Sequence, residues 1–210
     1  MVLPVVHLVV RASEAADPVG IVTSDRVTGF LVATFLLAGA VMTATVVLGG
    51  GIAFLVDRTD LPLGRGLGWL AVLPLVVPTY VGALALDATF GPRGAATQLA
   101  WVRGFWGATL ALSLSTYPYV LLMTRAALAG LDPAVEEAAR ALGDRPVRVL
   151  WRVTVPQLRP ALAAGGLLSF LYVLSDFGAV SILQYDTLTR GIYLEFRSLA
   201  ADRSPAAVLG

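Results

Sequence analysis

The sequence contains no cysteine and no lysine, only one histidine, and few charged residues of either sign. Without cysteine there can be no disulfide, no thiolate metal site and no cysteine nucleophile. The glycine-rich loop that cradles ATP phosphates ends in an invariant lysine, so no such loop occurs and we expect no ATP on this chain. The net charge is only +1 and no basic tract is present, so nucleic acid is not an expected partner.

Chemistry for an enzyme is also scarce. His7 is the only histidine, and it has no second histidine or carboxylate at a spacing that suits a metal ion. A surface or packing role for His7 is therefore favoured over a ligand role. We expect no catalytic residue, no metal site and no cofactor held by this chain.

Apolar sequence is abundant instead. Hydrophobic residues make up 57% of the chain and charged residues 14%, and the mean hydropathy is +0.80. Four long apolar stretches cover residues 27–56, 66–86, 104–124 and 160–183. Each is long enough to cross a hydrocarbon core of about 30 Å as a helix. Buried helices of a soluble protein are disfavoured, because too little polar sequence remains to enclose them. The sequence thus predicts an all-α membrane protein, a multi-span transmembrane helical bundle.

Proline and glycine mark special positions in these stretches. Pro74 and Pro78 in the second stretch and Pro118 in the third are expected to kink their helices or to serve packing alone. The run of glycines at 49–51 is expected to allow close helix packing or a kink.

The only long polar connection, residues 129–160, carries five arginines, and positive charge of this density favours the cytoplasm. Alternation then places residues 57–65 on the same side. The segments 11–26, 87–103 and 184–204 are expected on the outer side.

A short helix is expected within the polar connection. Asp132 is a suitable N-cap, Pro133 fits the first helical position, and the following glutamates face the positive end of the helix dipole. Glu136 is expected to pair with Arg140 one turn later, and Gly143 to end the helix with a positive φ. Its predicted apolar face consists of Val135, Ala138, Ala139 and Leu142.

A second short helix is expected to start at Pro146. One face would carry Arg145, Arg148 and Arg152, and the other Val147, Leu150 and Trp151. Pro156 and Pro160 are expected to break the chain before the fourth span. Two amphipathic helices with an exposed pair of carboxylates and an arginine face suit either docking to another protein or a solvated loop on lipid headgroups.

The residues of this connection favour docking. The order Glu137-Ala138-Ala139, three residues, Gly143, nine residues, then Val153-Thr154-Val155-Pro156 resembles the E-A-A loop of ABC importer permeases. The resemblance implies that the loop forms the coupling helices, which seat in a separate nucleotide-binding subunit. The coupling residues it implies are Glu136, Glu137, Ala138, Ala139, Gly143, Val153, Val155 and Pro156.

Segments 57–62, 175–180, 185–187 and 192–193 are similar to those of ferric-iron permeases within this class. Permeases for thiamine, polyamine, sulfate or phosphonate share parts of them and remain alternatives. A passive channel or a structural membrane protein is the alternative from a different class, and the coupling loop speaks against it.

The resemblance implies a type I ABC importer permease, a multi-pass protein of the bacterial inner membrane that is not itself an enzyme. Its implied partners are an ATP-binding cassette subunit that binds and hydrolyses ATP, a second permease half or identical subunit, an external solute-binding protein and the lipid bilayer. Residues 1–26 are expected to be the end of a truncated span and an external segment. The permease transmembrane domain covers 27–183, and 184–210 form an external loop and the start of a truncated next span.

A polar path is expected between the third and fourth stretches. Ser169, Tyr172 and Asp176 follow one helix face at i, i+3 and i+7, and Ser113 and Tyr117 make a similar stripe. Facing stripes would line a translocation path. Asp176, a carboxylate in an apolar stretch, has two alternative roles: it caps a helix end or pairs with an arginine, or it contacts the binding protein.

Overall fold

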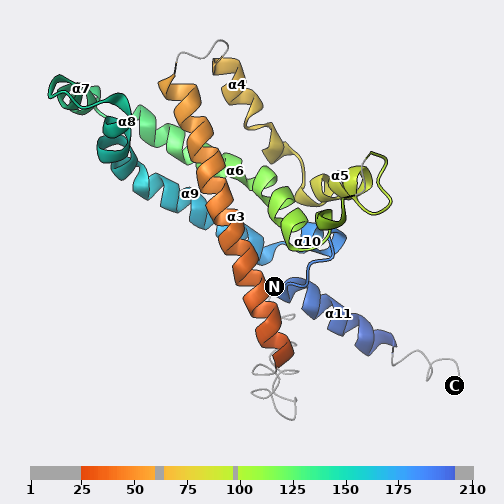
Figure 1. The fold of residues 1–210 in the computed structure, drawn as a ribbon. Coiled ribbons are helices and arrows are strands. Elements are labelled where there is room, and N and C mark those ends of the chain that lie inside the picture. Colours follow the sequence, from red (N-terminus) through yellow and green to blue (C-terminus); the bar gives the residue numbers. More distant parts are fainter. Residues whose placement is uncertain (1–24, 60–63, 97–98, 202–210) are drawn as a thin grey trace, which may run out of the picture.

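The computed structural model describes residues 25–59, 64–96 and 99–201, which form helices joined by turns and short connections (Figure 1). Helix labels follow Figure 1. His7 and the segments expected before residue 25 and after residue 201 lie outside the described residues. Within them, every regular element is helical, as predicted.

Three long helices form the centre of the fold. Helix α3 covers Asp25–Arg58, α6 covers Phe105–Ala129 and α9 covers Val155–Ser175. Each of the three packs against the other two, and they cross at clear angles (Figure 1). The first and third predicted spans are thus confirmed as helices. Pro118 lies inside α6 without interrupting it.

Glycine sets how closely these helices approach. A Cβ added to Gly49 would lie 2.6 Å from the carbonyl oxygen of Tyr117 in α6, and one on Gly165 would lie 2.7 Å from the Cα of Val120. Both distances are too short for a real methyl group, so α3 and α9 touch the α6 backbone only because these positions lack side chains. Gly51, by contrast, has no atom within 4 Å of its Cβ position. The predicted close-packing role is confirmed for Gly49.

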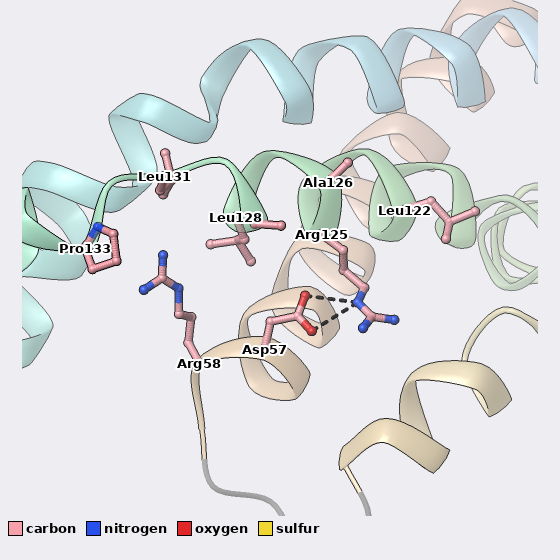
Figure 2. Close-up of a pocket in the computed structure, with 9 residues that line it drawn as sticks. Asp57, Arg58, Leu122, Arg125, Ala126, Leu128, Leu131 and Pro133 are labelled. Carbon is pink, nitrogen blue, oxygen red and sulfur yellow. Dashed lines mark hydrogen bonds and ion pairs between the residues drawn. The ribbon is translucent and has the colours of Figure 1, made fainter.

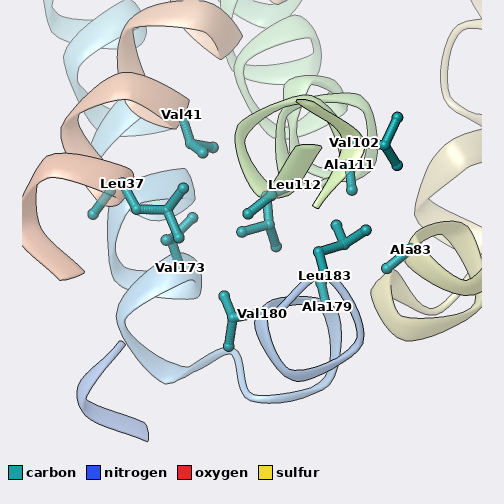
Figure 3. Packing of buried hydrophobic residues seen from close by; sticks show 12 residues of the cluster. Leu37, Val41, Ala83, Val102, Ala111, Leu112, Val173, Ala179, Val180 and Leu183 are labelled. Atoms are coloured by element: carbon teal, nitrogen blue, oxygen red, sulfur yellow. The ribbon is translucent and has the colours of Figure 1, made fainter. Parts of the chain in front are cut away.

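The glycines that follow these two, Gly50 and Gly166, lie at the contact between α3 and α9. A Cβ on Gly50 would lie 2.9 Å from Leu162, and one on Gly166 would lie 2.9 Å from Val46. Two clusters of buried apolar side chains fill the remaining space. The first cluster joins α3, α5, α6, α9 and α10 and includes Leu37, Val41, Leu112, Val173, Val180 and Leu183 (Figure 3). The second lies nearer the polar connection and contains Ala53, Tyr117, Leu121, Leu128 and Leu158.

The second predicted span is broken. It consists of α4 (Gly64–Leu70), a 3-10 turn η1 (Leu73–Val76) and α5 (Thr79–Phe90), and its two limbs meet at 93°. Pro78 directly precedes α5, with an extended ψ of 138°. Val77, the residue before this proline, is also extended, with φ −90° and ψ 119°. The proline ring disfavours a helical conformation of the residue before it, so the chain turns here instead of kinking gently.

The fourth predicted span begins earlier than expected. Helix α8 (Pro146–Val149) runs through a π-helical turn η3 (Leu150–Thr154) into α9, so the prediction that Pro156 and Pro160 break the chain is wrong. The π turn bonds the N–H of Val155 to the carbonyl of Leu150. Its extra residue widens the helix just before Pro156, where the proline ring needs room.

The C-terminal end of this span also differs from the prediction. Helix α9 stops at Ser175, and the short helix α10 (Gly178–Ile182) and then α11 (Leu188–Ala201) follow. Residues 160–183 are therefore not one helix.

By length and composition, two described helices can cross a membrane: α3 and the continuous helix Pro146–Ser175. The bent pair of α4–η1 with α5 raises this number to three if it counts as one span. Helix α6 is not among them, although it has 25 residues. It carries several hydroxyl side chains, and twelve of its residues are buried by the surrounding chain. The described residues thus support fewer spans than the four predicted.

The two ends of the bundle match the predicted alternation. Arg58 meets Glu136 of the polar connection at 3.1 Å, so the end of α3 adjoins the polar connection at one end of the bundle. At the other end, the Gly104 N–H donates to the Leu183 carbonyl at 2.6 Å, which joins the start of α6 to the end of α10. Which end faces the cytoplasm stays a prediction.

The glycine contact makes a stability prediction. We expect Gly49→Ala to lower the free energy of unfolding by about 1–3 kcal/mol, because the new methyl group overpacks against the α6 backbone. Gly51→Ala, two residues further along the same helix, meets open space and should be neutral or slightly stabilising. Thermal unfolding of both variants in detergent measures the difference. Equal melting temperatures for the two variants would contradict the close approach of α3 and α6.

Candidate coupling site

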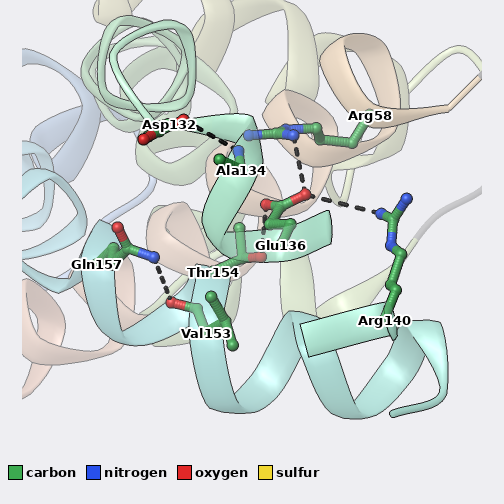
Figure 4. Close-up of polar contacts among 8 residues, drawn as sticks. All are labelled: Arg58, Asp132, Ala134, Glu136, Arg140, Val153, Thr154 and Gln157. Carbon is green, nitrogen blue, oxygen red and sulfur yellow. Dashed lines mark hydrogen bonds and ion pairs between the residues drawn. The ribbon is translucent and has the colours of Figure 1, made fainter. Parts of the chain in front are cut away.

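The first helix of the polar connection forms as predicted. Helix α7 covers Pro133–Ala141, and the Asp132 side chain accepts a hydrogen bond from the Ala134 N–H at 2.9 Å (Figure 4). Gly143 follows the helix with a φ of 89°. No atom lies within 4 Å of its Cβ position, so the need for glycine arises from the left-handed backbone alone.

Glu136 is the most connected residue of this helix, and only 7% of it is exposed. Its Oε1 accepts a hydrogen bond from Thr154 Oγ1 at 2.8 Å, and its Oε2 accepts one from Arg58 Nη1 at 3.1 Å (Figure 4). The predicted pairing with Arg140 is confirmed at 3.7 Å. The prediction of an exposed carboxylate pair is wrong for Glu136, since Glu137 alone lies exposed.

A second ion pair lies beside this network. Arg125 near the end of α6 donates from Nε to both carboxylate oxygens of Asp57, at 3.1 and 2.9 Å (Figure 2). The pair borders a hollow of about 540 Å³ between the ends of α3 and α6 and the start of α7, lined also by Arg58, Leu131 and Pro133. Sequence alone did not predict this pair, because its only signal is the position of Asp57 and Arg125 at the ends of apolar stretches.

The outer surface of the connection is apolar and basic. Leu142 is 88% exposed, and Val147 and Trp151 are exposed by about two thirds, at 67% and 66%. Val147 and Trp151 share a hollow of about 450 Å³ with Arg145, Arg148 and Arg152. The predicted separation of arginines and apolar residues onto opposite faces is thus wrong. Helix α8 has only four residues, and the π turn after it changes the angular spacing of side chains.

The remaining coupling candidates take different positions. Ala138 is exposed and Ala139 is partly buried. Val153, Val155 and Pro156 are partly buried at the start of α9. The structure therefore places the E-A-A part at the tip of the connection and the Val-x-Val-Pro part against the bundle.

At the opposite end, Asp176 lies between α9 and α10 instead of inside a span. Its Oδ1 accepts from the Ala179 and Val180 N–H groups at 3.0 and 3.4 Å, and its Oδ2 accepts from Thr79 Oγ1 at 2.8 Å. Only 8% of the residue is exposed. The capping alternative is thus present in the structure, and a hydrogen bond also joins this break to the start of α5.

The other path candidates do not gather with Asp176 into one row. Tyr172 joins it through Thr79, to which its hydroxyl donates at 3.3 Å. Ser169 is fully buried and donates to the Gly165 carbonyl of its own helix at 3.1 Å. Tyr117 belongs to the second buried cluster, whereas Tyr172 borders the first. Ser113 is buried in α6, and its hydroxyl has no hydrogen-bond partner among the described residues. A role of these residues in a path stays a prediction.

The helical connection between α6 and α9 lies within a region that matches a known protein family. Residues 46–200 match the family described as "Binding-protein-dependent transport system inner membrane component". The chain belongs to this family. The match contains α6, α7, α8 and α9 in full, together with the residues that hold Glu136.

Similar proteins are named as permeases for different substrates. The chain is 34% identical to an Fe(3+)-transport system permease protein of Haemophilus influenzae, over 99% of this chain and 39% of that protein. It is 30% identical to a probable molybdenum ABC transporter permease protein of Haloferax volcanii, over 94% of this chain and 74% of the relative. It is 31% identical to a sulfate transport system permease protein of Salmonella typhimurium, over 86% and 68%. The chain thus spans well under half of the iron relative.

Solved structures share the fold. An amino acid ABC transporter matches with a TM-score of 0.58 at 22% identity, over 83% of this chain and 78% of that one. The MetNI methionine ABC transporter matches with a TM-score of 0.55 at 18% identity, over 72% and 73%. These likenesses confirm a type I ABC importer permease fold.

Asp176 provides a test that separates capping from a path role. Asp176→Asn keeps an oxygen that can accept from the Ala179 N–H, so we expect unchanged thermal stability but uptake reduced several-fold by loss of the charge. Asp176→Ala removes the cap and should lower the free energy of unfolding by about 1 kcal/mol. Uptake by the assembled transporter and melting in detergent are the two measurements. Unchanged uptake kinetics in Asp176→Asn would leave Asp176 with the capping role alone.

Proposed function

We propose that this chain is the membrane-spanning permease part of an ATP-driven importer and that α7 and α8 couple it to an ATP-binding subunit. The observation that carries the proposal is the polar connection itself. The residues of the E-A-A motif lie in a capped helix at the tip of the bundle. Glu137 is exposed there, and Glu136 accepts hydrogen bonds from the end of α3 and the start of α9. Membership in a binding-protein-dependent transport family supports it.

The proposed docking surface is the exposed side of the connection. Leu142, Val147 and Trp151 expose large apolar area there, which a partner protein would cover. Arg145 and Arg152 have no ion-pair partner within the described part of the chain, so they offer positive charge to acidic groups of the partner.

ATP binding and hydrolysis belong, in this proposal, to the partner subunit. Closure of two such subunits around ATP would draw the coupling helices together and change the bundle from an inward-facing to an outward-facing state, a rigid-body rearrangement biased by ligand. A second permease half, or an identical subunit, and an external solute-binding protein complete the proposed assembly in the bacterial inner membrane.

Ferric iron is the proposed substrate. The iron relative aligns with 99% of this chain at 34% identity. The second candidate is an oxyanion, because the molybdenum and sulfate relatives follow at 30% and 31% identity over most of the chain.

The docking proposal predicts that Glu137→Lys weakens capture of the ATP-binding subunit. Reversal of an exposed charge at a protein interface costs affinity, and we expect a loss of about tenfold. Copurification of the subunit with the full-length transporter measures it. Asp25→Lys is the control, because Asp25 is an exposed acid in the first turn of α3, at the opposite end of the bundle. Equal copurification with both variants would contradict docking at α7.

The substrate proposal predicts uptake of ferric iron. The full-length transporter, reconstituted in liposomes with its ATP-binding subunit and binding protein, should accumulate ferric iron when ATP is supplied. Molybdate and sulfate, added in excess, should compete weakly. A matched preparation with a hydrolysis-deficient ATP-binding subunit should accumulate none. Strong competition by either oxyanion, or uptake of that oxyanion in place of iron, would overturn the iron assignment.

A further inference from the structure

Two neighbouring carboxylates of α7 have opposite environments. Glu136 is 7% exposed, whereas Glu137 lies exposed at the next position. Consecutive residues of a helix point about 100° apart, so one faces the bundle and the other faces away from it. The two side chains are chemically identical, so the sequence alone could not tell which of them contacts the bundle and which is free to contact a partner.

Glu136 connects α7 to both long helices that begin or end beside it. Arg58 is the last residue of α3 and lies 78 positions away in the sequence. Thr154 directly precedes α9 and lies 18 positions away. Each carboxylate oxygen has its own partners, with Thr154 on Oε1 and both arginines on Oε2 (Figure 4).

This connection is stiff for a physical reason. A buried carboxylate must keep its hydrogen bonds, because an unpaired charge in a dry site is strongly disfavoured. The hydrogen bond from Arg58 also joins two charged groups, and such hydrogen bonds are stronger than neutral ones. Helix α7 therefore cannot move away from α3 and α9 without exposing or unpairing Glu136.

A second ion pair extends the connection to α6. Asp57, the neighbour of Arg58, holds Arg125 near the end of α6. Figure 2 shows this pair, with Arg58 nearby, at the ends of α3 and α6. A displacement of α7 thus reaches α3 and α9 directly and α6 through α3.

We infer that Glu136 is a positioning residue of the transport cycle, which transmits displacement of α7 to the bundle while Glu137 serves docking. The inference rests on the proposed function. A purely structural role, in which Glu136 only stabilises the fold, is the competing explanation, and the two make different predictions for paired variants.

Glu136→Gln is the first variant to compare. The amide keeps the size of the side chain and can still accept from Thr154, but it loses the charge that holds both arginines. We expect normal copurification of the ATP-binding subunit, because Glu136 faces the bundle. The ATP hydrolysed per ion transported should rise by about tenfold, the order of effect for losing a charged hydrogen bond.

The decisive variant is the double change Glu136→Gln with Arg58→Gln. Replacing both members of a pair removes the unpaired charge and tends to restore stability. If Glu136 only stabilises the fold, the double variant recovers both melting temperature and coupling. If Glu136 transmits displacement, the melting temperature recovers and the ratio of ATP to transported ion stays high.

The measurements use the full-length transporter with its ATP-binding subunit and binding protein in liposomes, with ferric iron, molybdate and sulfate each tested as the transported ion. Glu137→Lys should lose the subunit. The matched control is Asp25→Asn, a change of an exposed acid at the opposite end of the bundle, which should keep both subunit capture and the normal ratio. Loss of subunit capture by Glu136→Gln, a normal ratio in that variant, or a recovered ratio in the double variant would each overturn the inference. An unaffected Glu137→Lys would count against docking at α7 alone and leave the Glu136 result valid.

Discussion

Helices that associate in a bilayer gain little from the hydrophobic effect, so the bundle depends on close van der Waals contact between α3, α6 and α9. Gly49 and Gly165 provide this contact, because any side chain there would collide with the α6 backbone. Gly50 and Gly166 lie between α3 and α9, where an added Cβ would crowd the side chains of Leu162 and Val46 and not the backbone. This contact sets how closely the three helices approach one another, and the ion pairs at their ends depend on that approach.

The charged end of the bundle follows from that geometry. Asp57 and Arg58 end α3 beside the end of α6 and the start of α7, so each reaches an opposite charge. The two glutamates of α7 differ in orientation: Glu136 faces the bundle and Glu137 faces away from it. A rigid junction with an exposed tip fits the proposed docking of an ATP-binding subunit, because a displacement of the tip would be passed to the long helices.

The other end is organised by two broken helices. Pro78 precedes the start of α5, and α9 stops before Asp176. The two breaks meet through the hydrogen bond from Thr79 to Asp176. Broken helices leave backbone groups that need partners inside a membrane protein, and Asp176 serves two of them at the start of α10. Proline alone did not decide where breaks occur, since Pro118 and Pro160 lie inside continuous helices.

The sequence by itself determined the helical class, the long helices α3 and α6, the capped helix at 133–141 and the glycine turn after it, because apolar length, caps and positive φ are local properties. It also identified the family through the spacing of the E-A-A loop, which the family match confirms. Only the tertiary structure decided that Glu136 is buried, that Asp57 pairs with Arg125 and that the second span is bent by 93°. Burial and pairing depend on which helix ends meet, and residues 78 positions apart carry no local signal of their contact.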